Sequence, residues 1–232
     1  MFQLKRTCFL RGSRLAIPIM IGYLPLGLSF GVLAVQAGVS WIDATLMSIF
    51  IYAGAGQFMA INMYALGAAA MEIVIACFIL NLRYFVLGFT LGDKFRNLKK
   101  TWRYWLSLQV TDETFAVAAL EPINESDPHY QYFLGGLFMA SWGTWIFSSM
   151  LGGLLSNFIP AGLGNSMSIA LYAMFISLLV PAVRENIKAG YIAVLGALIS
   201  TLLSRVMSTG WSIVIATLAA SLTGIYFFKE VE

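Results

Sequence analysis

The chain has 232 residues, of which 59% are hydrophobic and 11% are charged, and its formal net charge is +3. A soluble domain carries roughly 25% charged residues, so this chain has too few charges to cover a surface that faces water. No basic stripe suggests nucleic acid, and two cysteines with a single histidine argue against a disulfide framework or a metal site. We therefore expect a membrane protein, whose outer surface faces lipid.

Residues 1–14 form a basic N-terminal segment that we place in the cytoplasm, and the first apolar run follows at 15–38. This run is longer than the roughly 7–15 apolar residues of a signal peptide, so we interpret it as a retained transmembrane segment. Pro18 and Pro25 interrupt it. Such Gly/Pro-interrupted segments point to the binding site of a transporter, and the alternative is a static kink with no substrate role.

The rest of the chain is a succession of apolar runs of about spanning length, separated by short polar or glycine-rich loops. These runs lie at 42–66, 69–91, 104–121, 131–157, 166–183, 187–204 and 208–228. We predict an all-α, polytopic integral membrane protein with about seven or eight hydrophobic segments, some of them broken or re-entrant. Residues 15–228 would form a single transmembrane domain.

The distribution of Lys and Arg constrains the topology. The N-terminal segment and the loop at 92–103 ("GDKFRNLKKTWR") are both basic, so both should be cytoplasmic. That requires an even number of crossings between them, whereas three apolar runs lie there. The second run contains "IYAGAGQFMA", with Gly54, Gly56 and Gln57 at its centre, and we predict that it is two half-helices in a re-entrant hairpin. The alternative is a continuous helix with a glycine packing face.

A weak internal repeat is also predicted. The stretch "SFGVLAV" at 29–35 resembles "TFAVAAL" at 114–120. Aligning them relates residues 15–91 to residues 104–185 as two units of three segments each.

Two adjacent acids, Asp112 and Glu113, stand in the middle of an apolar run, in "SLQVTDETFAVAAL". Counted from the basic loop, Glu113 lies ~15 Å deep and Arg83 ~13 Å deep on the preceding run. A charge at the bilayer centre costs ~2.5–3.5 kcal/mol on insertion scales, so we expect Arg83 to pair with one acid. Adjacent helical residues point ~100° apart, so the other acid would be free to titrate or to bind a substrate amine. The alternative is that both acids are structural.

Further polar groups accompany these charges in the same runs. We expect Asn81, Gln57, Thr111 and Thr114 to line a polar cavity with Arg83 and the acids, beside a helix break at Gly54 and Gly56. The alternative is that each polar side chain is an interhelical contact worth ~0.6 kcal/mol.

With these residues, the chain resembles the AzlC family of bacterial branched-chain amino acid exporters. The similar pieces occur in family order: "YLPLGLSFGVLAVQAG" (23–38), "YAGAGQFMA" (52–60), "LNLRY" (80–84), "TDETFA" (111–116) and "FLGGLFMASWGTW" (133–145). The resemblance implies a permease of the bacterial cytoplasmic membrane that exports leucine, isoleucine, valine or analogues. It also implies a small AzlD-like membrane subunit as a partner.

Energy coupling is expected from an ion gradient, because the sequence has no G-x-x-x-x-G-K-[ST] motif for ATP and no cofactor motif. A buried acid couples protons by being neutral in one state and charged in another, and Asp112 or Glu113 is the candidate. The alternative function is a non-transporting scaffold subunit of a transport complex. An enzyme is disfavoured because no intramembrane nucleophile–base pair is present.

Overall fold

The computed structural model of the chain describes residues 2–96, 98–120, 129–159, 176, 179–207 and 209–227. Within these ranges all regular structure is helical, which confirms the all-α prediction. The predicted run at 166–183 lies mostly outside the described residues.

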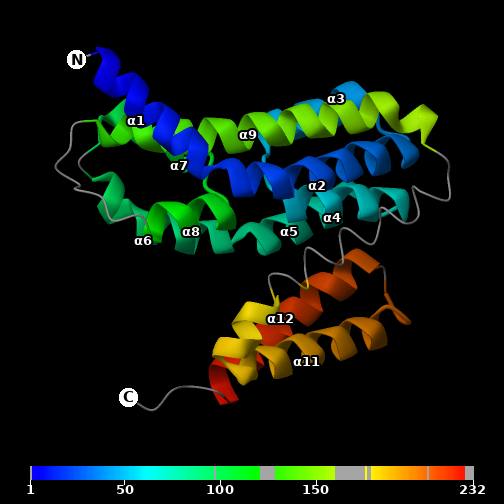
Figure 1. Cartoon of the computed structure of the whole chain (residues 1–232). Coiled ribbons are helices and arrows are strands. Elements are labelled where there is room, and N and C mark those ends of the chain that lie inside the picture. Colours follow the sequence, from blue (N-terminus) through cyan, green and yellow to red (C-terminus); the bar gives the residue numbers. More distant parts are fainter. Residues whose placement is uncertain are drawn as a thin grey trace.

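The central pair of helices is α2 (Ile17–Gln36) and α9 (Tyr130–Leu155), and α1 (Phe2–Leu15) extends α2 along the same partner (Figure 1). Glycines allow this close packing. A Cβ added at Gly31 would collide with the Ser149 carbonyl oxygen, as one added at Gly152 would with that of Leu28. This is the small-residue interface that lets membrane helices approach each other closely.

The second apolar run is broken, as predicted. It forms α3 (Trp41–Phe50) and α4 (Gly54–Ala65), separated at residues 51–53. The start of α3 lies at the end of α9, where Trp41 faces Gly153, and its end lies mid-way along α9, where Trp142 Nε1 donates to the Ile49 carbonyl at 3.3 Å. Figure 1 shows α4 running back from there. The two half-helices therefore form a re-entrant hairpin, with its break just before Gly54 rather than at Gly54–Gln57.

The third run crosses the fold as α5 (Ala70–Asn81) and α6 (Arg83–Phe95), which Leu82 separates. Within the described residues, two stretches are long and apolar enough to cross a membrane: Ile17–Gln36 and Ala70–Gly92. They correspond to the first and third apolar runs, which the topology argument retains as crossings.

The fourth run, of spanning length in the sequence, is also broken. It forms α7 (Lys100–Ser107) and α8 (Asp112–Leu120), separated at residues 108–111. Trp102 of α7 lies against Gly135 of α9, and the ring centroids of Trp105 and Trp142 are 6.4 Å apart. Helix α7 therefore follows α9 inward. Figure 1 shows α8 running back toward the end where α7 begins. This second hairpin enters from the end opposite to the first.

The two basic segments lie at the same end of the molecule. Lys5 Nζ lies 5.2 Å above the Tyr132 ring at the start of α9, and the Trp102 ring beside the basic loop lies 5.6 Å from the same ring. Two stretches of spanning length, Ile17–Gln36 and Ala70–Gly92, with a hairpin between them fit the even number of crossings that the charges require. Over residues 17–120 the order is spanning stretch, hairpin, spanning stretch, hairpin. The repeat of 15–91 and 104–185 stays a prediction.

The chain continues from α9 through a short 3₁₀ turn, η1 (Ser156–Phe158). Beyond a gap in the described residues, α11 (Ile187–Leu203) and α12 (Thr209–Phe227) pack against each other, and α12 contacts α5. Val214 is buried against Met63 and Ala76 at this contact. These helices lie on the side of α5 that faces away from α9 (Figure 1).

Candidate functional site

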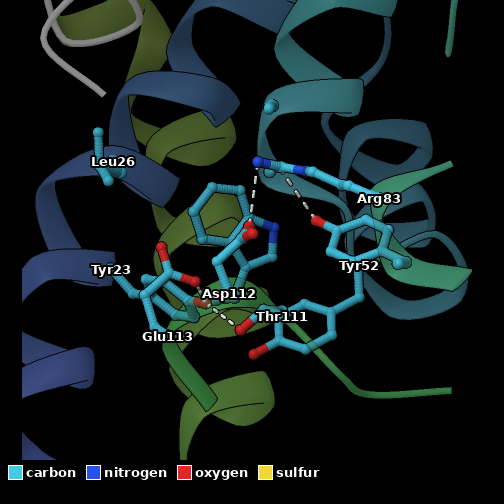
Figure 2. Close-up of a pocket in the computed structure, with 11 residues that line it drawn as sticks. Tyr23, Leu26, Tyr52, Arg83, Thr111, Asp112 and Glu113 are labelled. Atoms are coloured by element: carbon cyan, nitrogen blue, oxygen red, sulfur yellow. Dashed lines mark hydrogen bonds and ion pairs between the residues drawn. The ribbon is translucent and has the colours of Figure 1, made fainter. Parts of the chain in front are cut away.

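A small cavity lies where the tips of both hairpins meet the two crossing segments (Figure 2). Its volume is about 30 Å³, which leaves room for about two water molecules. Its walls come from the middle of α2 and α9 and from the starts of α4, α6 and α8. The lining residues are Tyr23, Leu26, Tyr52, Gly54, Ala55, Arg83, Tyr84, Thr111, Asp112, Glu113 and Trp145.

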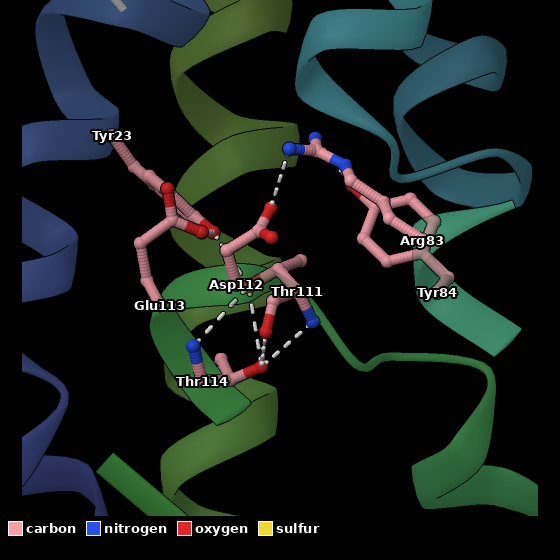
Figure 3. A network of polar contacts seen from close by, with 7 residues as sticks. All are labelled: Tyr23, Arg83, Tyr84, Thr111, Asp112, Glu113 and Thr114. Carbon is pink, nitrogen blue, oxygen red and sulfur yellow. Dashed lines mark hydrogen bonds and ion pairs between the residues drawn. The ribbon is translucent and has the colours of Figure 1, made fainter. Parts of the chain in front are cut away.

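The start of α8 carries the acids and fixes their positions. Thr111 precedes the helix, and its Oγ1 accepts a hydrogen bond from the Thr114 amide at 3.3 Å. Thr114 Oγ1 in return accepts from the Thr111 amide at 2.9 Å (Figure 3). This reciprocal capping ends the extended segment and starts a helix at Asp112. Both acids then lie in the first turn, where the helix dipole favours negative charge.

The two acids face different partners. Asp112 Oδ2 lies 3.1 Å from Arg83 Nη1, so the ion pair expected from their equal depth is present. Glu113 is turned toward α2, and its Oε2 accepts a hydrogen bond from the Tyr23 hydroxyl at 2.8 Å. The Tyr23 oxygen is also 2.8 Å from Thr111 Oγ1. The sequence left open which acid pairs with the arginine, and the structure selects Asp112.

Arg83 is further held by its own neighbour. Its Cζ lies 5.1 Å above the Tyr84 ring, and its Nη2 is 3.5 Å from the Tyr84 hydroxyl. The Arg83 and Asp112 side chains remain 29% and 28% exposed, so the pair stands at the edge of the cavity rather than sealed within the core.

Gln57 lies one layer behind the cavity. It is fully buried, donates from Nε2 to Ser48 Oγ at 3.1 Å, and accepts from Trp145 Nε1 at 2.9 Å. Trp145 lines the cavity, and a Cβ added at Gly54 would lie 3.2 Å from its ring. Gln57 therefore holds Trp145 in place instead of facing the cavity.

Of the predicted site residues, Gly54, Arg83, Thr111, Asp112 and Glu113 line the cavity. Gln57, Gly56, Asn81 and Thr114 do not. A Cβ added at Gly56 would lie 2.9 Å from Asn81 Nδ2, so these two residues form a close contact between α4 and α5. Thr114 supports Thr111 from behind.

Three tyrosines of the cavity, Tyr23, Tyr52 and Tyr84, were absent from the predicted site, as was Trp145. Tyr52 lies at the tip of the first hairpin with a φ of 41°, which is unusual for a bulky residue. The available signal was the position of the tyrosines in the sequence, near Pro25, Gly54 and Arg83.

This fold defines a polytopic helical membrane protein whose polar cavity lies at helix breaks, an arrangement that transporters use for their binding sites. The chain belongs to the AzlC family: the family described as "AzlC protein" matches residues 18–159. The matched range contains both hairpins and every residue that lines the cavity.

Relatives carry membrane and transport names. The chain is 32% identical to an uncharacterized membrane protein of Helicobacter pylori strain J99, over 97% of this chain and 98% of that protein. It is 27% identical to the inner membrane protein YgaZ of Escherichia coli, over 77% and 74%. It is also 27% identical to the branched-chain amino acid transport protein AzlC of Bacillus subtilis, over 69% and 62%. No solved structure matches significantly. The chain is therefore a membrane protein of a transport family.

Proposed function

We propose that this protein exports branched-chain amino acids, namely leucine, isoleucine, valine or analogues, across the cytoplasmic membrane. The observation that carries the proposal is the cavity where a carboxylate, an ion pair and three interrupted segments meet inside a chain of the AzlC family. The name of the Bacillus subtilis relative supports the substrate class. The residues proposed to bind the substrate or couple the ion are those predicted above, with Gln57, Gly56, Asn81 and Thr114 acting from behind the cavity wall.

The cavity suits a small zwitterion with an apolar side chain. Leu26, Tyr84 and Trp145 contribute apolar surface, while Arg83, Asp112 and Glu113 contribute charge. A leucine molecule needs several times the space of two waters, so the state described here is closed. Substrate entry requires the hairpin tips to separate, and the hairpins approach from opposite ends, so each tip is suited to open the cavity toward one side of the membrane.

Energy coupling is assigned to Glu113 rather than Asp112. Asp112 is already engaged in an ion pair, with Arg83 Nη1 3.1 Å from its Oδ2. Glu113 accepts a hydrogen bond from a neutral tyrosine. Intramembrane acids mark proton relays in transporters, so a proton gradient is the proposed energy source.

A small AzlD-like membrane subunit is the proposed partner, on the basis of the family resemblance. The alternative function is a scaffold that does not transport, in which the polar residues hold helices together. Under that alternative, neutralising Glu113 would change assembly and leave flux unaffected.

The test is counterflow of labelled leucine in proteoliposomes, with and without the small subunit. We expect saturable uptake by the wild-type protein and its loss in Glu113→Gln at equal insertion. Asp43→Asn is the matched control, because Asp43 is an exposed acid at the start of α3, outside the cavity. Absence of exchange for leucine, isoleucine and valine in correctly folded protein would refute the proposal and favour the scaffold.

A further inference from the structure

The start of α4 presents backbone donors to the cavity. The first intrahelical bond of this helix is donated by Gln57 to the Ala53 carbonyl at 2.8 Å, so the amides of Gly54, Ala55 and Gly56 come before the hydrogen-bonded ladder. No side chain caps the helix at Ala53, and its first turn contains no acid. Gly54 and Ala55 line the cavity. The positive end of the α4 dipole therefore lies at the cavity wall, and the first turn of α4 itself supplies no negative charge.

The other two helix starts at the cavity differ. Thr111 caps α8, and Asp112 and Glu113 supply negative charge in its first turn. The start of α6 follows α5 after a single residue, and Phe85 N already donates to the Leu82 carbonyl at 3.0 Å. Among the three, α4 is the one suited to receive an anion from outside the chain.

A second observation points to the same place. Tyr52 immediately precedes this helix start and is only 5% exposed, yet its hydroxyl makes no hydrogen bond to any residue that the structure describes. The Tyr23 and Thr111 hydroxyls lie nearby without hydrogen-bond geometry. A buried hydroxyl without a partner costs free energy, which a ligand would recover. Because Tyr52 lines the cavity, its hydroxyl is available to that ligand.

The opposite wall carries the complementary charge. In Figure 2, Glu113 lies with Tyr23 on the α2 side and Arg83 lies on the other side, while the Tyr52 ring lies beside Thr111. Arg83 and Asp112 compensate each other at 3.1 Å, which leaves the Glu113 carboxylate as the uncompensated charge among the lining residues. Once the hairpin tips separate and the cavity widens, these groups would hold a molecule with an anionic and a cationic end in one orientation.

We infer that the amides of Gly54 and Ala55 and the Tyr52 hydroxyl bind the α-carboxylate of the transported amino acid, and that Glu113 binds its α-ammonium group. This inference rests on the proposed function and deepens it. The apolar side chain then points toward the remaining cavity wall, where Leu26 and Trp145 lie. Proton and ammonium compete for the same Glu113 carboxylate, so the site holds either a proton or a substrate and exchanges one for the other.

The test is a crossed binding experiment on the full-length protein in lipid nanodiscs. Each variant is titrated with L-leucine, with L-leucinamide, which lacks the carboxylate, and with 4-methylpentanoate, which lacks the ammonium group. For wild type we expect leucine to bind at least about tenfold more tightly than either analogue, since hydrogen bonds to charged groups are strong. Tyr52→Phe should reduce the preference for leucine over leucinamide by about tenfold and leave the preference over 4-methylpentanoate unchanged.

Glu113→Gln should give the reverse pattern, with a lost preference over 4-methylpentanoate and a retained preference over leucinamide. Tyr64→Phe is the matched control, because Tyr64 is exposed at the far end of the same helix. Wild-type binding of leucine with equal losses for all three ligands in Tyr52→Phe would overturn the inference while the proposed function stands. Failure of wild type to bind leucine, isoleucine and valine would overturn both.

Discussion

Arg83 at the start of α6 and Asp112 at the start of α8 form an ion pair with Nη1 and Oδ2 3.1 Å apart. The pair joins a crossing segment to the tip of a re-entrant hairpin, across 29 positions of sequence. It therefore stabilises the hairpin at the depth where Glu113 meets Tyr23.

Replacing one member of this pair should lower the free energy of unfolding more than replacing both. Asp112→Asn leaves Arg83 without a carboxylate, and Arg83→Met leaves Asp112 without a cation, so each single change should destabilise the fold. The double variant should recover part of the loss, with a coupling free energy of ~0.5–3 kcal/mol. Reversible unfolding of the three variants in mixed micelles measures this cycle. If the losses in free energy of unfolding were strictly additive, the ion pair would contribute nothing to the stability of the hairpin.

The close contact of α2 with α9 makes a second prediction. Gly31→Ala should destabilise the protein strongly, because the new Cβ would collide with the Ser149 backbone, which cannot move without separating the helices. Gly22→Ala on the same helix is the control, since nothing lies within 4 Å of its Cβ position. We expect a lower thermal midpoint for Gly31→Ala alone. Equal midpoints for the two variants would contradict the close crossing.

Backbone conformation after α2 makes a third prediction. Gly38 has a φ of +93° with open space around its Cβ position, so Gly38→Ala isolates the cost of the left-handed conformation. That cost should be about 1–2 kcal/mol. Gly88→Ala in α6 also meets open space but has ordinary helical geometry, so it should be neutral or stabilising by up to ~1 kcal/mol. If both variants changed the free energy of unfolding in the same direction, the backbone angle φ would not be what decides the effect.

Gln57 provides a fourth prediction, because it connects Ser48 with Trp145 in a fully buried position. Gln57→Leu removes both hydrogen bonds and leaves the Trp145 Nε1 donor unpaired, which should cost ~1–3 kcal/mol and lower leucine exchange by shifting the cavity wall. The double variant Gln57→Leu/Trp145→Phe should recover stability but not exchange, since it removes the unpaired donor and alters the lining. Melting curves and counterflow rates, measured together, separate the two effects. Full exchange in Gln57→Leu would show that this contact has no bearing on the cavity.

The sequence was sufficient to recognise a helical membrane protein and the break in the second apolar run. Charge scarcity requires a lipid-facing surface, and the two basic segments require an even number of crossings, so both conclusions follow from properties that do not depend on contacts. The pairing of Arg83 with an acid also followed, because helical rise converts residue counts into depth. The fourth run was different. Its break at residues 108–111 depends on the mutual capping of Thr111 and Thr114, which an apolar run of spanning length conceals.

From the sequence by itself we predicted that Arg83 lies at a similar depth to Asp112 and Glu113, since depth is a sum over residues along each segment. Only the tertiary structure decided which acid meets the arginine and that Tyr23, Tyr52 and Trp145 complete the cavity. It also placed Gln57, Asn81 and Thr114 behind the wall. Depth fixes a residue along the membrane normal, whereas its neighbours depend on the rotation of each helix and on where each hairpin turns, and these are set by packing between distant segments.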